Sequence, residues 1–244
     1  LHLHHEIDYD REPRLGDAMA QHVQGAPAAA NACRYHVPRR HPRYCAADVL
    51  ALEYIEGHLV TDTAIGELSQ RRRNALGRAM LDLFFRELYA WGLLQTDPTL
   101  ECEAAFLQHL GGAIAAGLEQ DRTALLASLV GLGCLNAGSS AYARDTFTDF
   151  CFALLEPLRP PAQLPAEYLN ADGDYCWGRS QLLRRAGKRA ASSAASLDFA
   201  TPSRDFALIA RKLTGVFTFI AVLDAQFNGH DLAAGHIARW RAAG

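Results

Sequence analysis

The carboxylate of Asp97 is the first candidate for chemistry in this sequence. It lies in the stretch LLQTDPTL, directly before Pro98. A residue before proline is pushed toward extended backbone angles, so a preceding helix must stop there and Asp97 must project from a loop. Such a residue either shapes a turn or supplies a fixed carboxylate for catalysis, and the Asp-Pro pair alone does not separate these roles.

Three further carboxylates lie together near the start of the chain. They are Glu6, Asp8 and Glu12, in the stretch EIDYDRE. Apolar residues recur about every four positions from Glu6 to Val23, which predicts a helix. Asp8 and Glu12 share one face of this helix, whereas Glu6 points elsewhere. Helix carboxylates are ordinarily solvated, so a chemical role for these three needs further support.

Composition excludes several classes of protein. The chain has 244 residues, of which 50% are hydrophobic and 21% charged, as in an ordinary globular protein. Its net charge of -3 is too small to argue for nucleic acid, and we expect no nucleic-acid partner. The spacing of the six cysteines predicts reduced, mostly buried thiols, and no metal site is predicted. No apolar run reaches the roughly 18 residues of a membrane span, so we expect a soluble or membrane-surface protein.

Local patterns predict a mainly helical chain with one strand-bearing segment near its start. Alternation in DVLALEYIEG predicts a buried strand from Val49 to Tyr54, and Tyr35 to Val37 is a shorter candidate. Apolar residues at helical spacing predict helices over residues 61–94, 104–135, 141–158 and about 203–227, with a tail helix to Trp240. The long helix that ends near residue 94 would place Asp97 just beyond its end.

A strand, a glycine-marked hinge and a long helix that ends at a loop aspartate are typical of a protein-kinase C-terminal lobe. EIDYDRE resembles the E-x-D-Y-x-x-E segment of the UbiB family, the atypical kinase-like ATPases linked to isoprenoid quinone biosynthesis. VLALEYIEG is similar to that family's strand and hinge, and FFRELYAWGLLQTDP resembles its approach to the catalytic loop. RKLTGVFTFIAVLDAQF looks like its closing helix, so the resemblance covers most of the chain.

The resemblance implies a mainly α, atypical protein-kinase-like fold, chiefly the helical C-terminal lobe with a short strand-bearing N-terminal part. Residues 1–57 would hold the αC-like helix, the connection and the hinge strand of an N-lobe remnant. Residues 58–244 would form the helical C-lobe.

The resemblance also implies the site. Asp97 would be the catalytic carboxylate beside the γ-phosphate of ATP, where it orients a nucleophile or supports Mg²⁺ coordination. Glu12 would be the αC-like glutamate that pairs with a phosphate-binding lysine, and Glu6 and Asp8 the motif that works with an N-terminal extension. Backbone groups of the hinge would line the adenine pocket; its residues are Glu53, Tyr54, Ile55, Glu56 and Gly57.

The chain departs from the family pattern at several points. No glycine-rich or alanine-rich phosphate loop precedes Glu6, no lysine precedes Lys188, and Cys102 stands where the family has a metal-binding Asn. The Asp-Phe-Gly motif is also absent. Either parts of a longer chain are missing before Leu1 and between Leu100 and Glu101, or the site is degenerate. We expect the first.

The expected function is therefore that of an ATPase or small-molecule kinase that uses ATP and Mg²⁺ in support of isoprenoid quinone (ubiquinone) biosynthesis. The alternative is a non-catalytic pseudokinase or helical scaffold that binds a protein partner or lipid. Expected partners are a nucleotide, isoprenoid-quinone lipid precursors and quinone-biosynthesis proteins. The basic run RRAGKR is compatible with peripheral membrane contact, so the expected location is cytoplasmic, peripheral on the inner membrane.

Overall fold

The computed structural model describes residues 11–25, 33–96, 99–136, 138–193 and 204–243. Helices dominate it: α2 (Arg11–Gly25), α3 (Thr63–Gly66), α4 (Gln70–Arg86), α5 (Ala104–Glu119), α6 (Arg122–Gly131), α7 (Ala141–Leu154), α8 (Trp177–Ser180), α9 (Leu182–Ser193), α10 (Arg204–Val222) and α11 (His230–Ala243). The shorter elements are the 3₁₀ helices η1 (Pro42–Tyr44), η3 (Glu156–Leu158), η4 (Pro161–Gln163) and η5 (Ala166–Tyr168), the π-helix η2 (Glu87–Trp91), and the strands β1 (Leu93–Gln95) and β2 (Thr99–Glu101). The prediction of a mainly α chain is confirmed.

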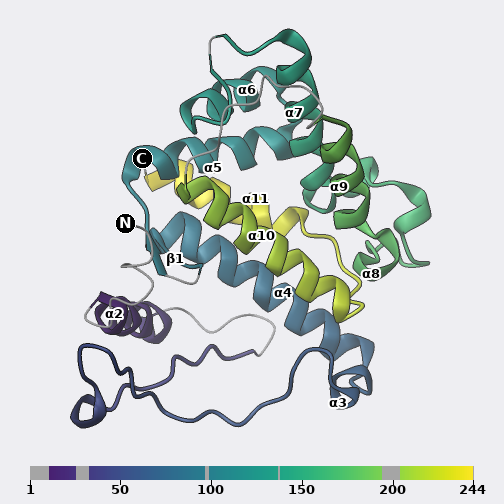
Figure 1. Cartoon of the computed structure of the whole chain (residues 1–244). Helices are drawn as coiled ribbons and strands as arrows, with labels where there is room; N and C mark the ends of the chain where they lie inside the picture. Colours follow the sequence, from purple (N-terminus) through teal and green to yellow (C-terminus); the bar gives the residue numbers. More distant parts are fainter. Residues whose placement is uncertain (1–10, 26–32, 97–98, 137, 194–203, 244) are drawn as a thin grey trace.

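The long helices lie in layers, with α10 and α11 between α4 and α5 (Figure 1). α4 packs against α10 and α11, and α5 packs against α11 and α6. α7 packs against α9, and α8 against α10, at the far end of the bundle from α2. Below α2 in Figure 1, the extended segment of residues 33–62 runs across the molecule to α3.

The core lies where α4 meets α10 and the segment that follows α10. Phe84 of α4 and Ile220 of α10 are fully buried, as is Phe227. The approach is close at Gly77, where a Cβ atom would lie 2.9 Å from the Phe227 ring and 3.0 Å from Ala225 Cβ. Gly77 therefore lets α4 lie directly on this segment, although glycine weakens a helix interior.

Side-chain caps mark the starts of three predicted helices. Ser69, Asp121 and Ser140 each accept a hydrogen bond from a backbone N–H in the first turn of α4, α6 and α7, respectively.

The end of the long helix, which continues from α4 through η2, differs from the prediction. It stops at Gly92, whose φ of 63° lies in the left-handed region that glycine adopts easily, rather than near residue 94.

The predicted strand from Val49 to Tyr54 is wrong, and so is the shorter candidate from Tyr35 to Val37. The extended segment instead makes isolated bridges, such as that between Arg40 and Leu52. Val49 and Leu52 are 49% and 47% exposed. The alternating apolar residues therefore do not form a buried face, which a stable strand would need. Among the described residues the strands lie in the hairpin β1–β2, within the part predicted to be helical, and not in the N-terminal part.

All six cysteines are free thiols, as predicted, but only Cys134 and Cys176 are buried; the other four are half-buried.

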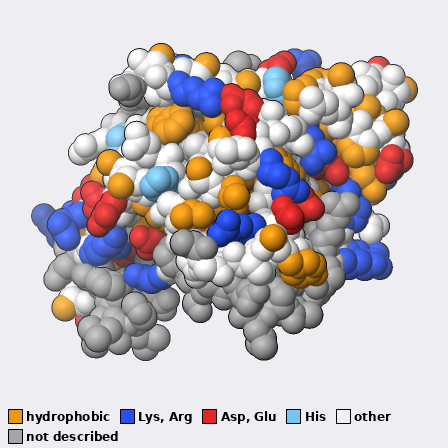
Figure 2. Space-filling model, turned by 90° about the horizontal axis from the view of Figure 1, so that it is seen from above, with side chains coloured by type: hydrophobic (Ala, Val, Ile, Leu, Met, Phe, Trp, Pro, Cys, Tyr) orange, Lys and Arg blue, Asp and Glu red, His pale blue; other side chains and the backbone are white. Residues whose placement is uncertain are grey.

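None of the helices in the described part of the chain combines the length and the apolar character of a membrane-spanning segment. On the face shown in Figure 2, basic and acidic side chains are interspersed, and neither sign forms one large patch.

A polar network centred on Asp82 joins three parts of the fold. Its carboxylate accepts hydrogen bonds from His236 Nε2 of α11 at 2.8 Å, from Arg86 Nε of α4 at 2.6 Å and from the Tyr35 hydroxyl at 3.2 Å. Burial by itself raises the pKa of Asp82, but the hydrogen bonds from His236 and Arg86 outweigh burial and lower it. The carboxylate is therefore stabilised in its charged form.

This network predicts a loss of stability in acid. Because the pKa of Asp82 is lower in the folded than in the unfolded protein, its contribution is complete above the unfolded value of about 3.9 and is lost as the pH falls through the folded value. We expect the free energy of unfolding of Asp82→Asn to depend less steeply on pH below about 4 than that of the wild type. Urea denaturation at a series of pH values measures both slopes, and equal slopes would contradict the assignment.

Candidate functional site

A short hairpin carries the loop of Asp97. β1 and β2 pair in antiparallel register, with Leu94 opposite Leu100 and Gln95 opposite Thr99. The side chains of Leu94 and Leu100 are buried in the helical core, at 0% and 8% exposure, and fix the hairpin to it. Asp97 itself lies between the strands but outside the described residues, as do the predicted site residues Glu6 and Asp8.

The start of α2 binds the outer edge of β2. The Glu12 carboxylate accepts hydrogen bonds from the backbone N–H and the hydroxyl of Thr99, both at 3.1 Å. Arg11 donates from Nη1 to the Thr99 carbonyl at 2.9 Å. Since Thr99 follows Asp97 by two positions, the structure brings Glu12 to the loop that carries Asp97. In the described structure the Glu12 carboxylate bonds the hairpin rather than a lysine.

A buried ion pair holds the outer edge of β1. Glu87, in η2, is 1% exposed, and its Oε2 atom lies 2.8 Å from Nζ of Lys212 in α10. The N–H of Gln95 donates to Glu87 at 3.2 Å, and Lys212 donates to the Gln95 carbonyl at 2.8 Å. Next to this pair, Arg211 donates to the carbonyl of Thr96. Side chains from η2 and α10 therefore engage both residues that precede Asp97.

Electrostatics make this pair interdependent. Burial raises the pKa of the Glu87 carboxyl, and Lys212 and the N–H of Gln95 offset this only in part. Removal of Lys212 would leave a buried carboxylate without a counter-charge, which proteins tolerate poorly.

Sequence reasoning did not identify Glu87, Lys212, Arg211 or Thr99 as site residues. A weak signal existed, because Lys212 is one of only two lysines and Glu87 interrupts the apolar stretch FFRELYAW. Charged residues in such stretches are usually exposed, so this signal alone would not have paired residues 125 positions apart.

The predicted adenine-pocket residues lie on the extended segment at the surface. Tyr54 is 89% exposed and Ile55 is 47% exposed, and Glu56 and Gly57 are exposed as well. The backbone N–H of Arg39 donates to the Glu53 carboxylate at 3.1 Å and lowers its pKa. The role of the hinge residues in nucleotide binding stays a prediction.

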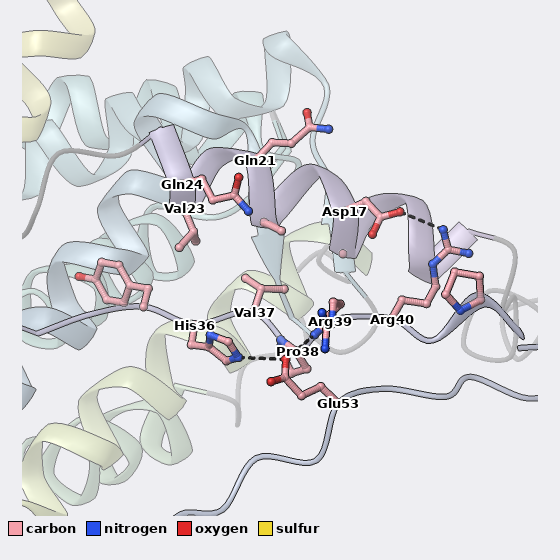
Figure 3. A pocket seen from close by; sticks show the side chains of 14 residues that line it. Asp17, Gln21, Val23, Gln24, His36, Val37, Pro38, Arg39, Arg40 and Glu53 are labelled. Atoms are coloured by element: carbon pink, nitrogen blue, oxygen red, sulfur yellow. Dashed lines mark hydrogen bonds and ion pairs between the residues drawn. The ribbon is translucent and has the colours of Figure 1, made fainter. Parts of the chain in front are cut away.

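A cavity of about 750 Å³ lies between α2 and the extended segment (Figure 3). On one side Asp17 pairs with Arg40 at 3.1 Å, and on the other Glu53 lies 3.3 Å from His36 Nε2. The walls thus carry both charge signs and do not select a ligand of one charge. None of the described hairpin residues lines this cavity.

Metal ligands do not converge in the described part of the chain: no three His, Cys, Asp or Glu side chains there form a cluster. The two carboxylates that reach the hairpin are already bonded, Glu12 to Thr99 and Glu87 to Lys212.

Known proteins resemble this chain over regions that include α2 and β1. The family model of the ABC1 atypical kinase-like domain matches residues 1–100. The chain is also 23% identical, over 253 residues, to the atypical kinase COQ8, mitochondrial, of Schizosaccharomyces pombe; the alignment covers 94% of this chain. The chain is thus similar to the UbiB-type atypical kinases.

A solved structure also resembles this chain in fold. Rv3197 of Mycobacterium tuberculosis, in complex with erythromycin, matches it with a TM-score of 0.59 and 20% identity over 94% of this chain. The predicted atypical protein-kinase-like fold is thereby confirmed. The chain spans 38% of the length of the yeast protein and 57% of the Rv3197 chain, so only part of each is represented here.

Proposed function

We propose that this chain is a kinase-like ATP-binding protein, an ATPase or small-molecule kinase that supports isoprenoid quinone (ubiquinone) biosynthesis. The observation that carries the proposal is the contact of Glu12 with Thr99, which joins α2 to the Asp97 loop. A helix glutamate and a loop aspartate also flank the nucleotide in kinase-like sites. The similarity to an atypical kinase supports the same class.

Each predicted residue has a role in this proposal. Asp97 orients the nucleophile that attacks the γ-phosphate. Glu12 holds the hairpin, and Glu6 and Asp8 work with an N-terminal extension. Backbone groups from Glu53 to Gly57 line the adenine pocket. ATP and Mg²⁺ are the proposed cofactors.

Nucleotide binding and turnover by the wild-type chain test the proposal. At free ATP of about 100 times Kd, binding to the folded state alone stabilises a protein by about 2.7 kcal/mol, which thermal melting detects. We therefore expect ATP with Mg²⁺ to raise Tm and phosphate to be released. If the full chain shows neither a rise in Tm nor phosphate release, the proposal is wrong.

A second candidate is a non-catalytic pseudokinase or helical scaffold that binds a protein or lipid. It is favoured by Cys102, which stands where the resemblance predicts a metal-binding Asn. Nucleotide stabilisation without phosphate release would support the pseudokinase, and no nucleotide effect would support the scaffold.

Helix α9 supports a peripheral membrane contact in the same proposal. Leu182 and Ala186 are buried against the core, whereas Arg184 and Lys188 are exposed. This orientation suits contact with anionic headgroups, at about 1 kcal/mol per base near the surface, rather than insertion. The proposed partners are isoprenoid-quinone precursors or quinone-biosynthesis proteins, at the cytoplasmic side of an inner membrane. Co-sedimentation with anionic but not neutral vesicles is the expected result; equal recovery with both would contradict it.

A further inference from the structure

We propose that Glu87 and Lys212 are positioning residues that fix the β1–β2 hairpin, whose two strands flank Asp97 in the sequence. This inference rests on the proposed function, in which Asp97 carries the chemistry. Neither residue needs to touch the nucleotide for this role.

The first support is the geometry of the two hairpin edges. In an antiparallel pair, the backbone groups of alternate residues point away from the partner strand. At Gln95 these outward groups are taken by Glu87 and Lys212, at 3.2 and 2.8 Å. At Thr99, opposite Gln95, the N–H and C=O are taken by Glu12 and Arg11. A carboxylate and a cation thus replace a neighbouring strand on each edge of this two-stranded hairpin, on both sides of the Asp97 loop.

The second support is that the anchors come from separate, well-packed elements. Glu87 is in η2, which continues α4, and Lys212 is in α10, which packs against α4. Lys212 is flanked along its helix by the buried residues Ile209 and Val216. A hairpin of three-residue strands has few ladder bonds of its own, so its position depends on such anchors.

The third support is the burial of the pair. Glu87 is 1% exposed, and the Lys212 side chain is 13% exposed. A buried ion pair contributes little net stability compared with apolar residues of similar size, because both charges lose their hydration. Stability alone is therefore a poor account of a charged pair at this place, whereas directional bonds to Gln95 need charged or polar partners.

The experiment compares Lys212→Met, Glu87→Met and the double variant with the wild-type chain. The matched control is Arg71→Met, which removes one exposed cation from the start of α4. We expect kcat for ATP turnover to fall about 100-fold in Lys212→Met, the loss that a misplacement of about 1 Å produces, with KM for ATP changed less than about twofold. Melting temperature is measured beside the kinetics.

The double variant separates positioning from a merely structural role. It leaves no unpaired charge, so we expect its melting temperature to return toward that of the wild type while kcat stays low. Recovery of kcat together with stability, or a wild-type kcat in Lys212→Met, would overturn the inference.

A wild-type chain that does not turn over ATP would count against the proposed function alone. Hydrogen exchange tests the positioning role in that case as well. The Thr99 amide is bonded to Glu12 on the opposite edge, so it loses no direct partner in the double variant. We expect its exchange to become at least about tenfold faster in the double variant and to stay unchanged in Arg71→Met, because local opening of the hairpin sets the rate. Unchanged exchange at Thr99 in the double variant would overturn the positioning role.

Discussion

Asp97→Asn is expected to lower ATP turnover at least about 100-fold, at the lower end of what a positioned acid–base group contributes. The amide keeps the shape of the side chain but removes the charge that a kinase-like site uses to orient a nucleophile. Folding should change by less than roughly 1 kcal/mol, because Asn suits a turn as well as Asp does. Steady-state phosphate release and thermal melting of both forms in the full chain measure the two effects.

The control for this change is Asp172→Asn, the same substitution in an exposed turn elsewhere. Its turnover should equal that of the wild type. If Asp97→Asn also hydrolyses ATP at the wild-type rate, Asp97 is a turn residue and the enzyme proposal loses its main support.

Trp177→Ala should cost about 3–5 kcal/mol of folding free energy, the largest stability effect that we expect from one substitution in this chain. The indole is 1% exposed, and its ring lies 5.2 Å from Phe217 and 5.3 Å from Phe227 between centroids. Its Nε1 also donates to the Phe227 carbonyl at 3.0 Å. Truncation would therefore leave both a cavity between α8 and α10 and a buried carbonyl without its donor.

Urea denaturation of wild type and variant measures this cost. Tyr142→Ala is the matched control, since this aromatic residue of α7 is 58% exposed and should change stability by about 0.5 kcal/mol or less. A cost of less than about 1 kcal/mol for Trp177→Ala would show that the aromatic cluster does not hold this end of the bundle.

Helices were predictable where the apolar repeat was long and the caps were local. Leu76, Met80 and Phe84 recur at helical spacing, and α4 forms there with Ser69 as its cap. That helix ends at Gly92 rather than near residue 94, where the apolar pattern before Asp97-Pro98 predicts its end. A glycine in the left-handed conformation can end a helix earlier than a proline requires, and β1 then occupies the intervening residues.

The strand from Val49 to Tyr54 failed for a different reason. Alternation predicts a strand only if a neighbouring strand supplies hydrogen bonds and a core covers one face. In this chain the neighbour provides only scattered bonds, such as that from Glu53 N to the Arg39 carbonyl at 2.7 Å. Neither condition is encoded in the six residues themselves.

The sequence alone predicts the helical class of the chain, its likeness to UbiB-type atypical kinases and the candidates Asp97 and Glu12, because these depend on local periodicity and short motifs. The contacts of Glu12 with Thr99 and of Glu87 with Lys212, on the two edges of one hairpin, emerge only in the folded chain. Ion pairs and backbone anchors form between residues that are close in space, whatever their separation in the sequence. The packing of α10 on α4 brings Glu87 and Lys212 together, and no local pattern in the sequence records that packing.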